Sequence, residues 1–214
     1  MVPNWAKNIL FLLVYMISGL VLVIIIEGLL SGSDLTPLNT VVEQVVVHMR
    51  TPLVTTFLVW VTRIGNPFIL SCVALFLAIL LILKKHIYDA ALFLVALIVA
   101  VVSLTIFKNV FQITRPVSDV YVADGWSFPS GHATVATAFF FLLALTFFGK
   151  MRTTGRKTAL IIGSIVGASL VSFSRLYLGA HWTLDILAGA ALGLLCVSFT
   201  VLIFNIFFEN KRSL

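Results

Sequence analysis

Six long runs of apolar residues dominate this chain and limit the folds that it can adopt. Most of the runs approach the roughly 20 residues that an α-helix needs to cross the hydrocarbon layer of a membrane. The runs are continuously apolar, which favours helices over the alternating strands of a membrane barrel. We therefore predict an all-α polytopic membrane protein with six transmembrane helices in a bundle, at Ile9–Ile26, Pro67–Leu83, Ile87–Phe107, Ala133–Phe148, Ala159–Phe173 and Leu184–Phe208.

The composition agrees with this class of protein. Hydrophobic residues make up 61% of the 214 residues, charged residues make up 10%, and the mean hydropathy is +1.15. A chain of this length cannot bury so many apolar side chains in one water-soluble core. No composition shift or repeat marks a domain boundary, so we predict one transmembrane domain over residues 1–214. The first run is too long for a signal peptide and no small-residue cleavage site follows it, so we expect a retained anchor.

Basic residues are distributed unequally between the two sides of the predicted bundle. With six spans, nine lysines and arginines fall on the side of the termini and five fall on the other side. Positive residues favour the cytoplasmic side of a membrane. We therefore predict a cell-membrane protein with both termini in the cytoplasm. The net charge of +6 is explained by this topology, and we expect no nucleic-acid binding.

The stretch Ser31–Asn66 differs from the apolar runs because prolines interrupt it. Its apolar residues recur at three- and four-residue spacing, which is typical of an amphipathic helix in the membrane interface. We predict such a helix between the first two spans, where it either gates the entry of a lipid or merely covers the bundle. The apolar stripe consists of Leu38, Val41, Val42, Val45 and Met49, with Glu43, Gln44 and His48 among them.

Two pairs of glycines, Gly163 with Gly167 and Gly189 with Gly193, lie four residues apart within apolar runs. Small residues at this spacing allow membrane helices to approach closely. Glycine is also common in membrane helices for other reasons. Either pair could therefore lie at a tight helix crossing.

The remaining polar residues gather in three clusters at the outer ends of predicted spans. The first cluster ends the third span, the second begins the fourth, and the third connects the fifth and sixth. Because successive spans cross the membrane in opposite directions, the bundle can bring the three clusters to one face. The clusters are Lys108, Arg115 and Pro116; Ser130, Gly131 and His132; and Ser174, Arg175, His181 and Asp185.

Three members of these clusters, Lys108, Arg115 and Arg175, are cations without a carboxylate spaced to pair with them. Cations close together at a membrane surface are costly unless an anion joins them. The planar guanidinium of arginine suits phosphate because it donates two parallel hydrogen bonds. The Pro-Ser-Gly turn adds unpaired N–H groups at a helix start, the hydroxyl of Ser130 and, at Gly131, room for an oxygen. We therefore predict a phosphate-binding site.

Two histidines border this phosphate site. His181 lies one helical turn before Asp185, so the carboxylate can accept one ring N–H and leave the other nitrogen free to attack phosphorus. His132 lies at a helix start, where it can donate a proton to a leaving alkoxide. We predict that His181 is the nucleophile and His132 the general acid, and that the cations neutralise the transferred phosphoryl group.

These motifs resemble the signature of the type-2 phosphatidic acid phosphatase family: Lys, six residues, Arg-Pro, then Pro-Ser-Gly-His, then Ser-Arg, five residues, His, three residues, Asp. Every fixed position is matched between Lys108 and Asp185, and the six-span profile extends the resemblance over almost the whole chain. The resemblance implies hydrolysis of a lipid phosphate through a phosphohistidine, without a metal or other cofactor. It also implies the roles assigned above.

The resemblance leaves several lipids open as the substrate. Small bacterial members of the family act on phosphatidylglycerol phosphate, undecaprenyl pyrophosphate or phosphatidate. The chain most resembles the bacterial phosphatidylglycerophosphatases B, so we expect phosphatidylglycerophosphate, with undecaprenyl pyrophosphate as the alternative. The active site is expected on the extracytoplasmic side, and no feature of the sequence indicates an oligomeric state.

Two other functions compete with the phosphatase prediction. The site also resembles that of vanadate-dependent haloperoxidases, but these are soluble and the six predicted spans argue against them. A lipid-phosphate transporter would recognise the head group without chemistry. The pairing of His181 with Asp185 argues against a transporter, since binding alone needs no oriented imidazole.

Overall fold

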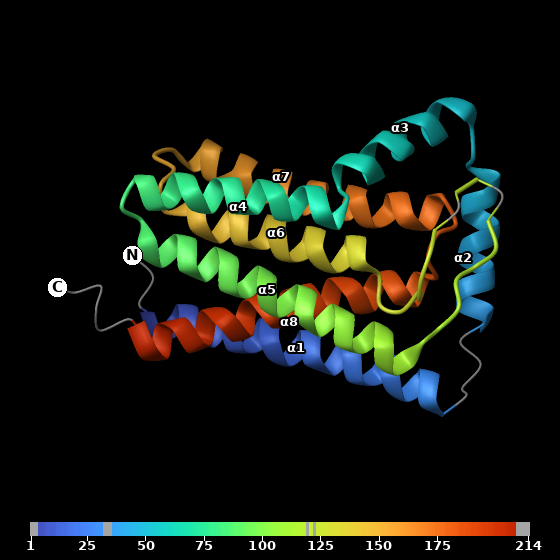
Figure 1. The fold of residues 1–214 in the computed structure, drawn as a ribbon, viewed down its shortest axis with the longest axis horizontal. Coiled ribbons are helices and arrows are strands. Elements are labelled where there is room, and N and C mark those ends of the chain that lie inside the picture. The colour runs from blue at the N-terminus through green and yellow to red at the C-terminus, as the bar shows by residue number, and fades with distance from the viewer. Residues whose placement is uncertain (1–3, 32–35, 119, 122, 209–214) are drawn as a thin grey trace.

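The structure, a computed structural model, describes residues 4–31, 36–118, 120–121 and 123–208. Helices α1 and α4 to α8 run alongside one another in a bundle, whereas α2 lies across one end of it and α3 leans away from it (Figure 1). The predicted all-helical membrane architecture is confirmed. Over the described residues the chain forms no β-strand and eight helices, which are α1 (Asn4–Leu30), α2 (Thr36–His48), α3 (Pro52–Ile64), α4 (Pro67–Leu83), α5 (Ile87–Phe111), α6 (Gly131–Phe148), α7 (Thr154–Tyr177) and α8 (Thr183–Phe208).

Five of the helices, α1, α5, α6, α7 and α8, are each long and apolar enough to cross a membrane. Helices α3 and α4 pass the same test only together, as a pair that is bent by 48° at the break between them, so the bundle has up to six spans. Helix α4 coincides with the predicted span Pro67–Leu83. The sequence predicts one interfacial helix before it, whereas the structure has two helices there, and the second forms the bent pair with α4.

Two of the prolines that interrupt the sequence begin helices α3 and α4. Pro52 and Pro67 each lie in a first turn, behind the N-cap residues Thr51 and Asn66. Proline is tolerated there because its missing N–H would have no partner within the helix. The side chain of Asn66 accepts a hydrogen bond from the N–H of Phe68 at 2.9 Å. These caps start α4 directly after α3 and fix the bend between them.

Helices α6 and α8 form the centre of the bundle. In its most apolar window α8 has 56% of its residues buried, the largest share among the single spans. A Cβ built on Gly189 or on Gly193 would lie 2.6 Å from a backbone carbonyl oxygen on or next to α6. This predicted glycine pair therefore lies at a tight helix crossing. In the other pair Gly167 meets an aromatic ring closely, but Gly163 faces open space.

Helix α2 contacts the bundle with a small part of its apolar surface. Val46 is buried against the C-terminal end of α7. Most of the predicted stripe faces outward instead, which fits a helix whose surroundings are the apolar part of a membrane interface. The side chains of Leu38 and Glu43 lie outside the described residues. The exposed members of the stripe are Val41, Val45 and Met49.

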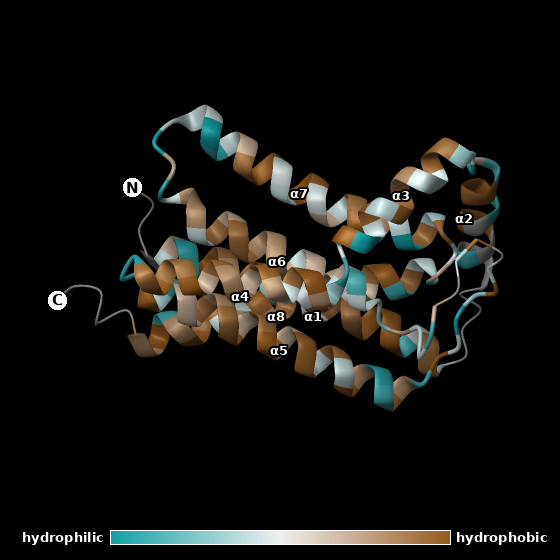
Figure 2. Ribbon diagram, turned by 45° about the horizontal axis from the view of Figure 1, so that its top comes forward, coloured by the Kyte–Doolittle hydropathy of each residue, from teal (hydrophilic) through white to brown (hydrophobic). Residues whose placement is uncertain are grey.

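The bundle has an apolar middle and two more polar ends (Figure 2). Helix α1 begins and α8 ends at one end, where the turns from α4 to α5 and from α6 to α7 also lie (Figure 1). We call this the terminal end. The opposite end, which we call the loop end, carries helix α2, the segment 112–130 and the turn 178–182.

Candidate active site

The predicted site residues all lie at the loop end of the bundle. They come from four helices and from the two segments that connect them, so the fold brings the three sequence clusters to one face. The residues are Lys108 in the last turn of α5, Arg115 in the segment 112–130, Ser130, Gly131 and His132 at the start of α6, Arg175 in the last turn of α7, His181 in the turn 178–182 and Asp185 in the first turn of α8.

Arg115 joins the connecting segments through its guanidinium. Its Nε donates to the carbonyl oxygen of Gly125 at 2.9 Å and its Nη2 to that of Asp124 at 3.0 Å. Its Nη1 donates to the carbonyl oxygen of Ala180 at 2.8 Å and lies 2.9 Å from Nε2 of His181. One side chain therefore fixes the segment 112–130 against the turn that carries His181.

The surroundings of His181 determine which ring nitrogen carries its proton. Nδ1 lies 3.4 Å from Oδ2 of Asp185 and 3.3 Å from Oγ of Ser127. A guanidinium only donates hydrogen bonds, so the Nε2 that faces Arg115 must accept one. The proton of the neutral imidazole therefore lies on Nδ1, toward Asp185. This tautomer directs the Nε2 lone pair at the cations.

Burial keeps this imidazole neutral. His181 is 3% exposed, and desolvation lowers the pKa of its ring from 6.5 to about 4. The nearby carboxylate of Asp185 opposes this shift in pKa, while the charges of Arg115 and Arg175 add to it. Burial, and next the charge of Arg175, also holds the pKa of Arg115 below its usual value. Near pH 7 the Nε2 lone pair of His181 is free of a proton, as a nucleophile requires.

Asp185 receives several hydrogen bonds that fix its carboxylate. Its Oδ2 accepts from the backbone N–H of Trp182 at 2.9 Å and from the hydroxyl of Ser127. Both Asp185 and Ser127 are buried. The backbone carbonyl oxygen of Asp185 accepts from the N–H of Ser130 at 2.9 Å. Asp185 therefore connects His181 to the start of α6 as well as to its own helix.

Helix α6 begins with the turn that the sequence predicts as a phosphate cradle. The hydroxyl oxygen of Ser130 caps the helix by accepting from the N–H of Ala133 at 3.4 Å, which leaves the hydroxyl proton available to donate. The N–H groups of Gly131 and His132 precede the first hydrogen bond within α6, so they are available to an anion. A Cβ built on Gly131 would make no contact closer than 3.4 Å, so close packing does not require this glycine.

Arg175 is a buried cation, and no carboxylate of the described residues pairs with it. The residue is 2% exposed, its Nη1 donates to Oγ1 of Thr62 at 2.8 Å, and its guanidinium lies 4.7 Å from the ring centre of Tyr121. Within the described part of the chain, its buried Nε has no hydrogen-bond partner and no salt bridge reaches it. Burying an uncompensated charge is costly. The arrangement therefore suits a bound anion.

Lys108 and His132 lie beside the same groups. Nζ of Lys108 donates to the carbonyl oxygen of Trp126, which also accepts from Nη2 of Arg115 at 3.3 Å. His132 is half-buried and lies within electrostatic range of Arg175 and of His181. The three predicted cations and the two histidines therefore form one group.

Three residues that contact the predicted site residues are absent from the sequence prediction. Ser127 supports Asp185, and Thr62 and Tyr121 contact Arg175. Ser127 has a weak local signal, because it lies directly before the turn that precedes α6. Thr62 has none, because it lies on α3, 113 residues before its partner Arg175.

Comparison with known proteins agrees with this arrangement. The sequence model of the PAP2 superfamily matches residues 89–209. The chain belongs to the PAP2 superfamily. This membership confirms the predicted resemblance to the type-2 phosphatidic acid phosphatases, and the matched range contains all the predicted site residues.

Two named relatives of this PAP2 chain are phosphatases. An undecaprenyl-diphosphatase of Sulfolobus acidocaldarius is 34% identical over 123 residues, which cover 54% of this chain and 55% of that protein. Phosphatidylglycerophosphatase B of Bacillus subtilis is 28% identical over 162 residues, which cover 72% of this chain and 77% of that protein. The chain thus spans little more than half the length of the first relative and about three quarters of the second.

Two crystal structures share the fold. A transmembrane PAP2 type phosphatidylglycerolphosphate phosphatase from Bacillus subtilis matches with a TM-score of 0.73 and 22% identity, over 94% of this chain and 97% of that one. LpxE of Aquifex aeolicus matches with a TM-score of 0.58 and 24% identity, over 77% of this chain and 94% of that one. This PAP2 chain is therefore a multi-pass membrane protein with the helical fold of these phosphatases.

Proposed function

We propose that this PAP2 chain is a lipid phosphate phosphatase that removes the terminal phosphate of a membrane lipid through a phosphohistidine at His181. The observation that carries the proposal is the Nε2 lone pair of His181, oriented by Asp185 and directed at the guanidinium of Arg115. An oriented neutral nucleophile beside cations that form no salt bridge among the described residues suits phosphoryl transfer better than binding alone.

In the first half-reaction, Nε2 of His181 attacks phosphorus, a nitrogen–phosphorus bond forms, and the bond from phosphorus to the lipid oxygen breaks. His132 donates a proton to the leaving oxygen. Arg115 gives up its contact with Nε2, because the phosphoryl group and the guanidinium need the same lone pair. Arg115, Lys108 and Arg175 then neutralise the phosphoryl oxygens.

In the second half-reaction, water attacks the phosphohistidine and the neutral His132 accepts a proton from that water. The nitrogen–phosphorus bond breaks, its electron pair returns to Nε2 of His181, and inorganic phosphate is released. Asp185 accepts the Nδ1–H throughout and stabilises the positive imidazole while Nε2 carries the phosphoryl group. The chain supplies all the charges for these steps, so no metal or other cofactor is required.

Phosphatidylglycerophosphate, which yields phosphatidylglycerol, is the substrate that we favour. The phosphatidylglycerophosphatase B relative covers 72% of this chain, against 54% for the undecaprenyl-diphosphatase, which supports this choice. Undecaprenyl pyrophosphate is the alternative substrate. We assign residues 1–214 to a single domain, since the groups at the site come from helices α5 to α8, from the segments between them and, through Thr62, from α3.

Release of inorganic phosphate from detergent-solubilised phosphatidylglycerophosphate tests this function. We expect release by the unaltered protein, the same rate in excess EDTA, and no release by His181→Ala. Lipid binding without phosphate release would favour a transporter. Loss of activity in EDTA that Mg²⁺ alone restores would reject the metal-independent mechanism.

We also propose that the loop end faces the extracytoplasmic side and that both termini are cytoplasmic. The support is that the turns at the terminal end carry the basic residues Lys84, Lys85, Lys150 and Arg152, and such residues favour the cytoplasm.

Cysteine labelling tests this orientation. In a background without Cys72 and Cys196, a cysteine at Val117, which is 93% exposed in the segment 112–130, should react with a membrane-impermeant maleimide in intact cells stripped of outer barriers. A cysteine at the exposed Thr154, at the start of α7, should react after lysis alone. The reverse pattern would place the loop end in the cytoplasm.

A further inference from the structure

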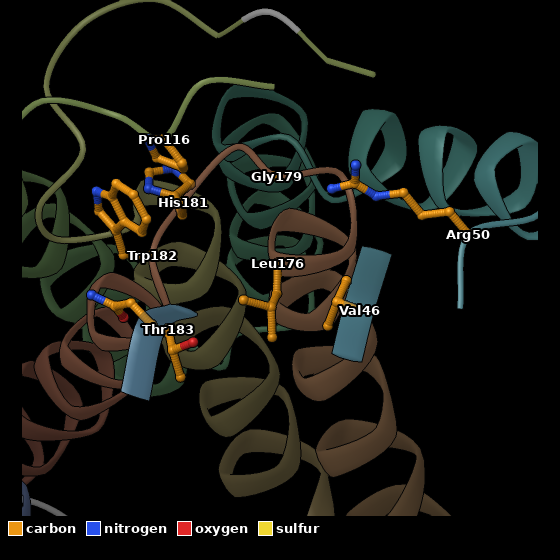
Figure 3. Close-up of a pocket in the computed structure, with 9 residues that line it drawn as sticks. Val46, Arg50, Pro116, Leu176, Gly179, His181, Trp182 and Thr183 are labelled. Atoms are coloured by element: carbon orange, nitrogen blue, oxygen red, sulfur yellow. The ribbon is translucent and has the colours of Figure 1, made fainter. Parts of the chain in front are cut away.

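A cavity beside His181 has no role in the proposed reaction. It lies between α2, the turn from α2 to α3, and the turn 178–182, and its lining includes His181, Gly179, Asn39 and Arg50. In Figure 3 the guanidinium of Arg50 points toward Gly179, and His181 lies on the other side of Gly179 in this view. The cavity is small, with a volume of about 10 Å³, so its lining residues can contact the edge of a substrate held at His181 but do not enclose it.

Arg50 is held in place, but its charge is not compensated. Its Nε donates to the carbonyl oxygen of Tyr177 at 3.0 Å, and the hydroxyl of Tyr177 accepts from the N–H of Thr51 at 3.0 Å. These bonds fasten the turn from α2 to α3 to the end of α7. In the described part of the chain, no carboxylate pairs with Arg50 and its two terminal nitrogens have no hydrogen-bond partner. A fixed guanidinium with free N–H groups suits a phosphate.

Gly179 keeps the space between Arg50 and the active site open. Its φ of +67° lies in the left-handed region, which favours glycine. A Cβ at this position would lie 3.0 Å from Nη2 of Arg50 and 2.8 Å from Oγ of Ser118. Gly179 also lines the neighbouring cavity, together with Arg115 and Tyr121. A side chain here would therefore stand between the cations of the active site and Arg50.

Asn39 adds an unpaired acceptor to the cavity that contains Arg50. Its Oδ1 is buried and lacks a hydrogen-bond partner among the residues that the structure describes. Leaving a buried acceptor unsatisfied is costly, and a hydroxyl group of a ligand would satisfy it. Asn39 lies near the start of α2 and Arg50 just beyond its end, so the two residues offer a ligand two separate contacts, one for a hydroxyl and one for a negative charge.

We infer that Arg50 binds a second phosphate of the substrate, the one that stays on the lipid, and that Asn39 accepts a hydrogen bond from a hydroxyl of the substrate. A phosphodiester joined through a glycerol to the terminal phosphate has both groups, as in phosphatidylglycerophosphate. A lipid diphosphate has the second phosphate without the hydroxyl, and phosphatidate has neither. The inference rests on the proposed function, since His181 must hold the phosphate that is removed.

The test compares three lipids on the full chain in detergent: phosphatidylglycerophosphate, undecaprenyl pyrophosphate and phosphatidate. Arg50→Gln should lower kcat/KM for phosphatidylglycerophosphate roughly ten- to hundredfold, mainly through KM, because a charge-assisted hydrogen bond is lost. With phosphatidate, the loss in kcat/KM caused by Arg50→Gln should be smaller by a factor of about ten, or absent. Arg50→Lys should recover part of the activity that Arg50→Gln loses with phosphatidylglycerophosphate. Arg63→Gln, which removes an exposed arginine beside Trp60, is the matched control and should change none of these rates.

Asn39→Ala tests the hydroxyl contact separately. It should lower kcat/KM for phosphatidylglycerophosphate and leave undecaprenyl pyrophosphate unaffected. Equal losses for these two lipids would overturn the role of Asn39. For Arg50→Gln, equal losses for phosphatidylglycerophosphate and phosphatidate would mean that Arg50 only fastens the turn to Tyr177. An unchanged rate with phosphatidylglycerophosphate would also overturn the role of Arg50.

Binding to the His181→Ala protein separates this inference from the proposed function, because binding needs no turnover. Phosphatidylglycerophosphate should bind this protein more tightly than phosphatidate does, and Arg50→Gln should remove the difference. Such binding, together with no hydrolysis by the unaltered protein, would reject the phosphatase function and keep the second-phosphate site. Equal binding of the two lipids to the His181→Ala protein would overturn the second-phosphate site.

Discussion

The two ends of the bundle compensate their positive charges in different ways. At the terminal end, Lys150 pairs with Asp89 at 2.6 Å, and the two side chains remain 30% and 19% exposed. At the loop end, Arg175 is 2% exposed and meets a hydroxyl and an aromatic ring, with no carboxylate among the described residues. A charge that is partly exposed to water and paired with a counter-ion is already stabilised, whereas a buried charge without a counter-ion is costly. The difference supports the proposal that an anion binds at the loop end.

The hydrogen-bond networks at the two ends differ in the same way. At the terminal end, the hydroxyl of Tyr88 donates to Asn205, whose amide donates to Asn8, so side chains of α5, α8 and α1 bond one another. At the loop end, the network through Ser127 and Asp185 ends at the lone pair of His181. The first network holds helices together, and the second orients the ring nitrogen that we propose as the nucleophile.

The largest expected effect concerns the two histidines of the loop end. His181→Ala should abolish both turnover and the trapped phosphoenzyme for every substrate, because the nucleophile is lost. His132→Ala should cost roughly a hundredfold to ten-thousandfold with a lipid alkoxide as the leaving group, which is typical for loss of a general acid. The loss should be smallest with p-nitrophenyl phosphate, whose leaving group departs without a proton.

Rapid quenching and steady-state rates check this division of roles. Tyr88→Phe removes a hydroxyl from the terminal-end network and should leave both measurements unchanged. A phosphohistidine that survives in His181→Ala would contradict the role of the nucleophile. Equal losses for both leaving groups in His132→Ala would contradict the role of the general acid.

Much of this division between the ends could be predicted from local sequence. The apolar runs locate the spans, and α4 occupies the predicted residues Pro67–Leu83. The motifs around Lys108, His132 and His181 place the charged groups at the ends of those spans. These features depend on hydrophobicity and spacing within short segments, which a sequence displays directly.

The rest could not be predicted because it depends on contacts between distant segments. In the sequence Pro52 suggests an interruption of helical structure, but it follows the N-cap residue Thr51 and begins α3. The bond from Arg175 to Thr62 joins residues 113 positions apart and has no local signal. The outward stripe of α2 could not be oriented either, because residues that face lipid and residues that face a core are equally apolar.

Replacing the buried cation should separate activity from stability. Arg175→Met should lower kcat/KM roughly a hundredfold to a thousandfold, since a group that stabilises the transferring phosphoryl is lost. The same change should leave stability unchanged or raise it by about 1 kcal/mol or more, because it removes an uncompensated buried charge. Thermal unfolding in detergent and lipid phosphatase rates measure the two effects.

The matched change at the terminal end should affect stability and leave activity unchanged. Lys150→Met breaks an ion pair that is partly exposed, so it should lower stability by less than about 1 kcal/mol and leave activity intact. If Arg175→Met destabilised the protein and Lys150→Met did not, the contrast between the two ends would be wrong.

Acidification should lower the stability of the folded protein through protonation of His181 at the loop end. An unfolded histidine takes up a proton as the pH falls through about 6.5, but in the folded protein the pKa of His181 is about 4. The stabilisation is therefore complete above pH 6.5 and is lost as the pH falls toward 4. The interval of about 2.5 between the two pKa values, at 1.36 kcal/mol per pH unit, corresponds to about 3 kcal/mol.

Thermal midpoints between about pH 7 and pH 4 check this loss. His181→Gln cannot take up the proton and should lose less stability over the range. His86→Gln, at the terminal end, leaves the buried imidazole of His181 in place and should behave like the unaltered protein. Equal acid sensitivity in the His181→Gln and unaltered proteins would show that this imidazole does not control it.

The smallest effect is expected from a change at Ser127, and it tests the contrast between the two hydrogen-bond networks. Ser127→Ala removes the hydroxyl that donates to Asp185 while leaving Asp185 and His181 in place. Hydrogen bonds to charged groups contribute roughly 1.5 kcal/mol or more, so kcat should fall about tenfold, with little change in KM. Ser127→Thr keeps the hydroxyl and should recover most of the rate.

A double-mutant cycle with Asp185→Asn decides whether Ser127 acts through that carboxylate. If it does, Ser127→Ala should add little to the loss already caused by Asp185→Asn, because residues in one network are not additive. A purely structural role would instead give two losses that multiply, together with a lower thermal midpoint in Ser127→Ala. Tyr88→Phe, which also removes a single hydroxyl, should affect stability alone, because the terminal-end network leads to no reacting atom.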